Sequence, residues 1–234
     1  MIYKVLKRTK LFFLFGFFTF LTGCITPESN IIESHVSAKA SSYKINSIVL
    51  LPLEKDDTTD TGTFYSTNHF LNALKENYPP KSIDVLEIDK IIGTDSLAVK
   101  KIIESIRKNG KLDIENFFST DLGSLLTQKN PDAMILGTIN NSTKNIHFWL
   151  DTSMLLNCRW TIECDFVYYL ISLKDGEVLW MSNVLGVANY EEEVSSSFES
   201  DWKLYPPLDI AITNGIDKIF NTLPFKKDTT QYFY

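Results

Sequence analysis

The chain has 234 residues, of which 44% are hydrophobic and 22% are charged, a balance typical of a globular protein with a sizeable core. Its formal net charge is −6, and without residues 1–23 the remaining 19 basic and 29 acidic residues give −10. An acidic chain without a basic stripe argues against nucleic-acid binding and against a polybasic membrane patch, because both require clustered Lys and Arg.

A basic segment followed by an apolar one opens the chain. Four basic residues lie within the first ten, and residues 11–24 carry no charge. This run is shorter than the roughly 20 apolar residues that a membrane-spanning helix needs, and it matches the apolar core of roughly 7–15 residues in a secretory signal. The sequence therefore predicts a signal peptide at residues 1–23. The alternative is a short membrane anchor that stays attached.

The end of this run, Leu21-Thr22-Gly23-Cys24, resembles the bacterial lipobox, in which Leu and two small residues precede a Cys. The resemblance implies that the Cys24 thiol receives a diacylglyceryl group, that cleavage occurs before Cys24, and that the new amine is acylated. Several acyl chains give the stable anchoring that one chain cannot give. Ile25 stands where an Asp often retains lipoproteins in the inner membrane, so the analogy favours the outer membrane. A disulfide of Cys24 is the alternative, and it would leave the flanking Leu and Gly unexplained.

The residues after the cysteine divide into a polar segment and a folded domain. Residues 24–44 are rich in Ser and charged side chains and lack a clean hydrophobic period. We interpret them as the lipid anchor and a flexible tether that lifts the domain off the membrane. Residues 45–225 are predicted to form a single α/β domain, and residues 226–234 a polar C-terminal tail.

The domain begins with strands and helices in alternation. The apolar run at residues 45–53 is typical of a strand covered on both faces. The most regular helix is predicted at 95–110, where Asp95 can cap the start and Gly110 the end. The other elements expected before residue 140 are a helix at 64–77, a strand at 82–89, a helix in 113–129 broken near Ser119–Thr120, and a buried strand at 132–139.

A long hairpin follows. Apolar and polar residues alternate from Leu156 to Leu170, which predicts an amphipathic strand. Asp175-Gly176 is a turn signal that returns the chain in a second strand at about 177–189. Cys158 and Cys164 fall on the apolar side of the first strand, too far apart for a disulfide, so we expect buried free thiols.

A helix at about 208–222 completes the domain, and the order predicts an α/β fold: a mixed β-sheet with a long C-terminal antiparallel hairpin and flanking helices. This order resembles the fold of the TolB amino-terminal domain, the peptidoglycan-synthase activator LpoB and the curli secretion lipoprotein CsgG. Most of residues 45–190 is also similar to a family of outer-membrane lipoproteins of about this length. The segments that carry the resemblance are the lipobox, "VLLPL", "FYST", "PDAMILGTI" and "LISLKDGEVLWMS", whereas the polar stretch at 93–121 departs from it.

The sequence offers no constellation of residues for catalysis, a cofactor or a metal. His35, His69 and His147 are scattered, and the acidic cluster Asp56, Asp57 and Asp60 lacks the spacing of a calcium loop. No GxSxG, GxGxxG or P-loop motif is present, although two carboxylates could meet in any fold. We therefore predict that the protein is not an enzyme and binds no cofactor.

The predicted function is that of a lipid-anchored envelope lipoprotein of the outer membrane, acting through protein contacts as an accessory factor or subunit of an envelope complex. Its predicted partners are the membrane, through acyl chains on Cys24, an envelope protein, and further copies of itself. The alternative is a subunit of a CsgG-like secretion channel. The resemblance to CsgG would then make the hairpin from about 154 to 189 a membrane-inserting element, whereas its ordinary interpretation is two central strands.

Overall fold

The computed structural model describes residues 26–54, 62–77, 84–86, 96–151, 153–193 and 205–224. The signal peptide predicted for 1–23, Cys24, the acidic loop at 56–60 and the tail at 226–234 lie outside these residues. The strands are β1 (Asn30–Val36), β2 (Ser47–Glu54), β3 (Asp84–Leu86), β4 (Ala133–Leu150), β5 (Leu156–Ser172) and β6 (Val178–Glu193). The helices are α2 (Gly62–Asn77), α3 (Ser96–Asn109), α4 (Ile114–Phe118), α5 (Asp121–Lys129) and α6 (Leu208–Ile219), with a 3-10 turn at Ala40–Ser42.

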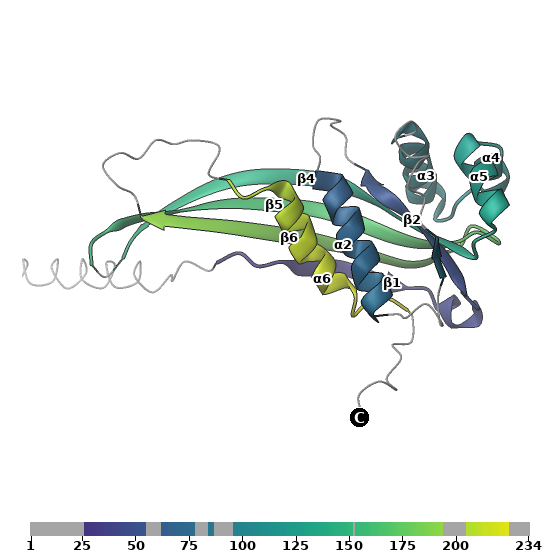
Figure 1. The fold of residues 1–234 in the computed structure, drawn as a ribbon, viewed down its shortest axis with the longest axis horizontal. Coiled ribbons are helices and arrows are strands. Elements are labelled where there is room, and N and C mark those ends of the chain that lie inside the picture. The colour runs from purple at the N-terminus through teal and green to yellow at the C-terminus, as the bar shows by residue number, and fades with distance from the viewer. Residues whose placement is uncertain are drawn as a thin grey trace, which may run out of the picture.

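The described strands form one sheet in the order β1-β6-β5-β4-β2-β3 (Figure 1). β2 runs parallel to β3 and β4, whereas β4, β5, β6 and β1 are antiparallel neighbours. The predicted fold class is confirmed: the sheet is mixed, its hairpin is long, and helices flank it. The turn at Asp175-Gly176 is also confirmed, because the Gly176 N–H donates to the Ser172 carbonyl over 2.9 Å and Gly176 has a φ of +74°.

Alternation along the strands divides the core between the two faces of the sheet. α2 and α6 cover one face, and the α3–α5 group lies on the other (Figure 1). Under α2 and α6, Phe70 packs against Tyr168 and Phe220 with ring centroids 4.6 and 5.2 Å apart. Under α3–α5 the buried side chains include Val49, Leu51, Met134, Leu136, Val167 and Ile171. Both faces of the sheet are thus dry where the helices lie over them.

Two glycines let α6 approach the sheet closely. A Cβ added to Gly186 on β6 would lie 2.1 Å from the Ala211 carbonyl oxygen of α6. A Cβ on Gly215 of α6 would lie 2.6 Å from the Phe166 ring and 3.1 Å from the Gly186 Cα. Backbone packs directly on backbone here, which a side chain at either position would prevent.

The predicted tether is wrong for the part that the structure describes. Residues 30–36 form β1, an edge strand whose register with β6 runs from Asn30↔Leu185 to Val36↔Trp180, with a bulge between Ile31 and Glu33. All seven residues of β1 are exposed. A strand exposed on both faces needs no apolar alternation, so its sequence carries no period that could have predicted it.

The strand predicted at 132–139 continues to Leu150, so the hairpin is part of a three-stranded antiparallel unit. A register shift between Ile139 and Asn141 marks the point beyond which β4 is largely exposed. Ser142 to Asn145 are polar on both faces, which hides the alternation of a strand. Pairing with β5 decides the structure there, since a neighbouring strand overrides weak local preference.

The remaining elements follow the prediction closely. The helix expected in 113–129 is divided into α4 and α5 at Ser119–Thr120, as predicted. Asp113 caps α4 by accepting from the Asn116 N–H, and Thr120 caps α5 by accepting from the Gly123 N–H. None of the described helices combines the length and the apolar character that crossing a bilayer requires.

The glycine contact yields a stability prediction. Gly186→Ala should force α6 away from β6 and lower the free energy of unfolding by about 1–3 kcal/mol, the usual cost of overpacking. Urea denaturation followed by circular dichroism measures this difference. Gly110→Ala is the matched control, because a Cβ there meets nothing within 4 Å and only the positive φ of +72° opposes it, at about 1 kcal/mol. A smaller loss for Gly186→Ala than for Gly110→Ala would contradict the close contact.

Candidate functional site

The two ends of the long strands differ, and we name them by their turns. The distal end contains the β4–β5 turn at residues 151–155 and the last residues of β6, at the left of Figure 1. The proximal end contains the β5–β6 turn at 173–177 and lies next to α3–α5. The strands between these ends are about 50 Å long, given roughly 3.3 Å per residue.

The amino-terminal segment runs along β6 toward the distal end. Before β1 begins, the Ser29 hydroxyl oxygen accepts a hydrogen bond from the Val187 N–H over 2.8 Å. Further out, the Asn189 side-chain amide donates to the Pro27 carbonyl over 3.1 Å. Cys24 itself lies outside the described residues. The described chain that follows the predicted lipidation residue thus runs beside β6 from the side of the distal end.

An exposed apolar surface occupies the same end. Eleven large hydrophobic side chains are exposed among the described residues, and seven of them lie at or next to the β4–β5 turn. In register, Ile146, Phe148 and Leu150 on β4 oppose Trp160, Cys158 and Leu156 on β5, so their side chains share the face on which α6 lies. We call the seven residues the distal apolar surface: Ile146, Phe148, Leu150, Met154, Leu155, Leu156 and Tyr190.

The Asp151 side chain shapes the turn that carries the centre of this surface. Its Oδ1 accepts hydrogen bonds from the N–H groups of Ser153 and Leu155 over 2.8 and 2.9 Å. Met154 takes up a left-handed backbone conformation, with a φ of +63°, and its side chain is 79% exposed. The turn is thus held by its own hydrogen bonds while it presents Met154 and Leu155 outward.

The opposite face of the distal sheet is polar. The Arg159 side chain, only 8% exposed, forms an ion pair with Glu191 over 2.5 Å and lies over the Trp149 ring at 5.2 Å. His147 stacks beside Trp149 with ring centroids 6.3 Å apart. One row further in, the Thr161 hydroxyl donates to the Asn189 side-chain oxygen over 2.8 Å. The distal sheet therefore has one mainly apolar face, which also holds Glu192 opposite Cys158, and one face of paired polar groups.

The two described cysteines are buried free thiols, as predicted. The Cys158 thiol lies 3.7 Å from the Glu192 carbonyl oxygen, to which it can donate. Burial, together with the negative charge of Glu192, raises the pKa of the Cys158 thiol. A thiol held protonated in this way is a poor nucleophile, so Cys158 fits a packing role.

The three histidines do not come together. His69 on α2 contacts Asp217 on α6 over 2.7 Å, His35 is exposed on β1, and His147 is part of the distal polar face. In the ranges that the structure describes, no group of three His, Cys, Asp or Glu side chains could hold a metal ion.

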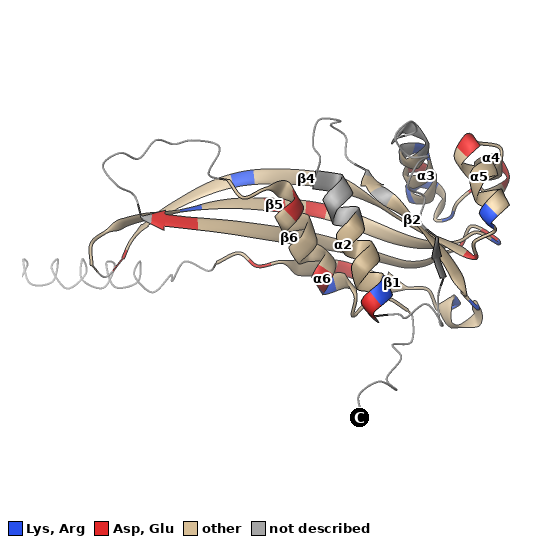
Figure 2. Cartoon of the chain, in the orientation of Figure 1, with Lys and Arg blue, Asp and Glu red and all other residues tan. Residues whose placement is uncertain are grey.

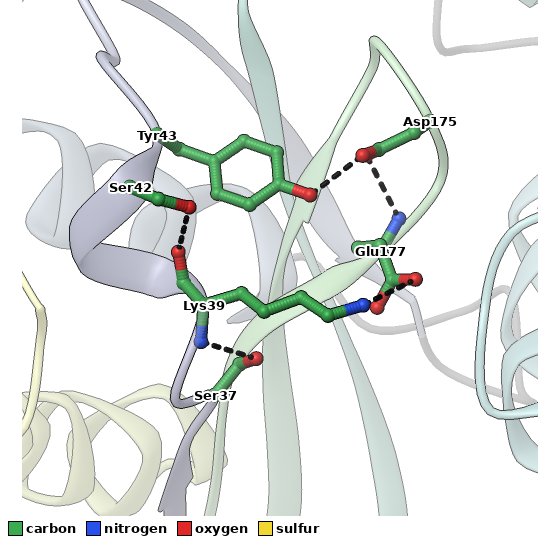
Figure 3. Close-up of polar contacts among 6 residues, drawn as sticks. All are labelled: Ser37, Lys39, Ser42, Tyr43, Asp175 and Glu177. Atoms are coloured by element: carbon green, nitrogen blue, oxygen red, sulfur yellow. Dashed lines mark hydrogen bonds and ion pairs between the residues drawn. The ribbon is translucent and has the colours of Figure 1, made fainter.

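A polar cluster at the proximal end fastens the segment between β1 and β2 to the β5–β6 turn (Figure 3). The Tyr43 hydroxyl donates to Asp175 Oδ2 over 2.6 Å, and Lys39 forms an ion pair with Glu177 over 3.4 Å. The amino-terminal segment is thus held at both ends, by Ser29 near the distal end and by Tyr43 at the proximal end.

The same contacts shift two pKa values in opposite directions. The hydrogen bond to Asp175, followed by burial and the nearby negative charges, raises the pKa of Tyr43 from 10.0 to about 12. Burial alone would raise the pKa of Asp175, but hydrogen bonds from Tyr43, Ser172 and the Glu177 N–H outweigh it and lower that pKa. The bond is therefore strongest while Tyr43 is protonated and Asp175 is ionised.

An open cavity of about 1050 Å³ lies beside this cluster, lined by Tyr43, Asp132, Asp175 and the apolar side chains of Phe118 and Leu126. Its carboxylates already have partners. Burial would raise the pKa of Asp132, but hydrogen bonds from the N–H groups of Asn46 and Ser47 lower it instead. These contacts connect the start of β2 to the start of β4.

The proximal cluster yields a stability prediction with a pH dependence. Tyr43→Phe removes one hydrogen bond to a carboxylate and should lower the free energy of unfolding by about 1 kcal/mol at pH 7. Because the pKa of Asp175 is lowered in the fold, its contribution is present above the ordinary value of 3.8 and is lost as the pH falls below it. Because the pKa of Tyr43 is raised, its contribution is lost as the pH rises from about 10 to about 12.

Urea denaturation at pH 3, 7 and 11.5 measures the difference between wild type and Tyr43→Phe. Lys39→Ala is the control, since an exposed ion pair contributes well under about 1 kcal/mol. An equal effect of Tyr43→Phe at all three pH values would contradict the proposed bond.

Comparison with known proteins finds no matching family model and no matching curated protein. Among solved structures, a PelC dodecamer from Paraburkholderia phytofirmans is 11% identical, covers 86% of this chain and 100% of its own, and has a TM-score of 0.39. The lipoprotein GNA1162 from Neisseria meningitidis is 17% identical, covers 75% and 99%, and has a TM-score of 0.33. A PDZ domain protein from Parabacteroides distasonis is 10% identical, covers 86% and 38%, and has a TM-score of 0.30. These similarities are distant.

Proposed function

We propose that this protein is a lipid-anchored bacterial envelope lipoprotein of the outer membrane that works through contacts with other envelope proteins. The observation that carries the proposal is the course of residues 26–36 along β6, which brings the chain from the predicted lipidation residue directly into the sheet. Only the residues from Cys24 to Pro27 separate the acyl chains from hydrogen-bonded backbone, so the domain stands on the membrane by its distal end.

This arrangement decides which surfaces remain for a partner. With the distal end at the membrane, α3–α5 and the open cavity lie about 50 Å away, the length of the central strands. The exposed edge of β1 lies between the two ends. A protein partner would therefore bind at the proximal end or at the β1 edge. That partner would belong to the envelope complex in which this lipoprotein is an accessory factor or a subunit.

A subunit of a secretion channel is the second candidate. The observation that favours it is the distal sheet itself, in which three strands carry apolar side chains on one face and polar side chains on the other. Such strands could join those of other copies around a pore. A channel requires a ring of subunits, so the size of the extracted protein separates the two candidates.

The first experiment tests the anchor. Cys24→Ala should abolish acylation, detected by mass spectrometry of the amino-terminal peptide, and should move the protein out of the membrane fraction. Cys158→Ala is the matched control, because it removes a buried thiol and leaves Cys24 in place. A wild-type protein with an unmodified Cys24 would refute the proposal.

The second experiment tests the contacts. Crosslinking and pull-down of the anchored protein from its native envelope should enrich at least one envelope protein. The control is residues 1–29 fused to an unrelated globular domain, which keeps the predicted anchor and lacks the sheet. If the two samples enrich the same proteins, the role through protein contacts is wrong. Ring-sized particles on native chromatography would favour the channel subunit instead.

A further inference from the structure

We infer that the distal apolar surface is a second, non-covalent membrane contact that lies in the headgroup and upper acyl region of a lipid bilayer. This inference rests on the proposed function, because it takes the anchored end of the chain as the membrane end. It adds a surface that binds lipid on its own and that fixes how the domain stands on the membrane.

The position of the surface is the first argument. Asn189 on β6 binds Pro27, and the next residue, Tyr190, belongs to the distal apolar surface. Tyr190 is in register with Trp160 on β5, which is in register with Ile146 on β4; Tyr190 and Ile146 are exposed, whereas Trp160 between them is buried. The point where the chain leads toward Cys24 and the exposed apolar side chains therefore lie at the same end of the same three strands.

The chemistry of the surface is the second argument. Leu150 and Met154 are 60% and 79% exposed, and the neighbouring residues are Ile, Leu and Phe. A contiguous exposed apolar patch on a globular domain marks an interaction site. Tyr190 adds an aromatic ring with a polar hydroxyl, a combination enriched where hydrocarbon meets headgroups.

The charges at this end select the kind of lipid. Asp151 begins the β4–β5 turn and Glu192 opposes Cys158 in register, whereas Lys144 is further in and faces the Tyr205 ring; Figure 2 shows acidic residues at the end of β6. Carboxylates near a bilayer are repelled by anionic headgroups. The occupant that fits is therefore a neutral, zwitterionic lipid surface, held by apolar burial.

The polar face limits how deep the contact goes. Arg159 and Glu191 lie on the opposite side of the same strands, and Glu191 is exposed. Charged side chains are costly in the hydrocarbon core, so the sheet does not pass into it. The turn and one face meet the lipid, while the polar face remains in water.

Met154 is well suited to a test because the effect of its exposed side chain can be separated from the effect of its left-handed backbone conformation. Its positive φ favours glycine, so Met154→Gly relieves the backbone while it removes the most exposed apolar side chain. A loss of lipid binding with this variant cannot be attributed to unfolding.

The test uses residues 24–234 with Cys24→Ala, which carries no acyl chain. All the contacts described above lie within residues 26–224, so this chain retains them. Co-sedimentation with phosphatidylcholine–phosphatidylethanolamine vesicles should show binding that 0.5 M salt leaves unchanged. Met154→Gly should weaken it at least threefold with an unchanged melting temperature, and Phe148→Ser/Leu150→Ser/Met154→Gly at least thirtyfold. Replacing a third of the lipid by phosphatidylglycerol should weaken it severalfold at low salt.

The control variants are Ile32→Ser and Ile210→Ser, which replace apolar side chains of 53% and 45% exposure elsewhere and should bind like wild type. The inference is overturned if the starting protein does not bind neutral vesicles or if its binding requires anionic lipid. It is also overturned if Met154→Gly binds the vesicles as tightly as the starting protein. The inference is also overturned if the surface joins two copies of the chain. In that case the starting protein would not bind vesicles, and Met154→Gly would change its mass in solution. Acylation of Cys24 is measured separately, so either idea can fail while the other stands.

Discussion

Pairing of β1 with β6 is the constraint on which the arrangement of this protein depends. It converts a segment that would otherwise link the domain loosely to its proposed anchor into the edge of the sheet. Hydrogen bonds at Ser29 and Tyr43 hold that segment at both ends, so residues 29–43 have a fixed course relative to the core. The orientation of the domain follows from that course, and so does the functional meaning of the distal end.

The long central strands have a proximal part that helices bury and a distal part that extends beyond the helices. Toward the proximal end, α2 and α6 on one face and α3–α5 on the other bury the sheet, and the close Gly186–Gly215 contact brings α6 onto it. Toward the distal end β4–β6 continue past the helices (Figure 1), with apolar side chains on one face and the Arg159–Glu191 pair on the other. The proximal part supplies the stability that lets the distal part expose apolar side chains to its surroundings.

The sequence predicted the parts of this fold that carry a strong period. The buried run of β2, the alternation of β5, the Asp175-Gly176 turn and the break between α4 and α5 are all present. It failed where pairing alone makes the structure, at β1 and at the outer half of β4, because strands exposed on both faces need no alternation. The distal apolar surface was hidden for the same reason, since Ile146, Phe148 and Leu150 become one face only when β5 fixes their register. Cys24 could be named from its local motif, but the pairing of residues 30–36 with β6 required the structure.

The direction of the chain in β1 limits how the free edge of this strand can pair with a second copy of the protein. An exposed edge strand invites a second copy to pair with it, and the commonest such pairing is antiparallel. Two copies joined in that way would point their amino termini in opposite directions, and two anchors in one bilayer could not accommodate this. Attachment to a surface would thus protect the molecule from edge-to-edge aggregation, aided by the bulge between Ile31 and Glu33. Under the proposed function, a chain released from the membrane would lose that protection, so mislocalised molecules would be the ones prone to associate.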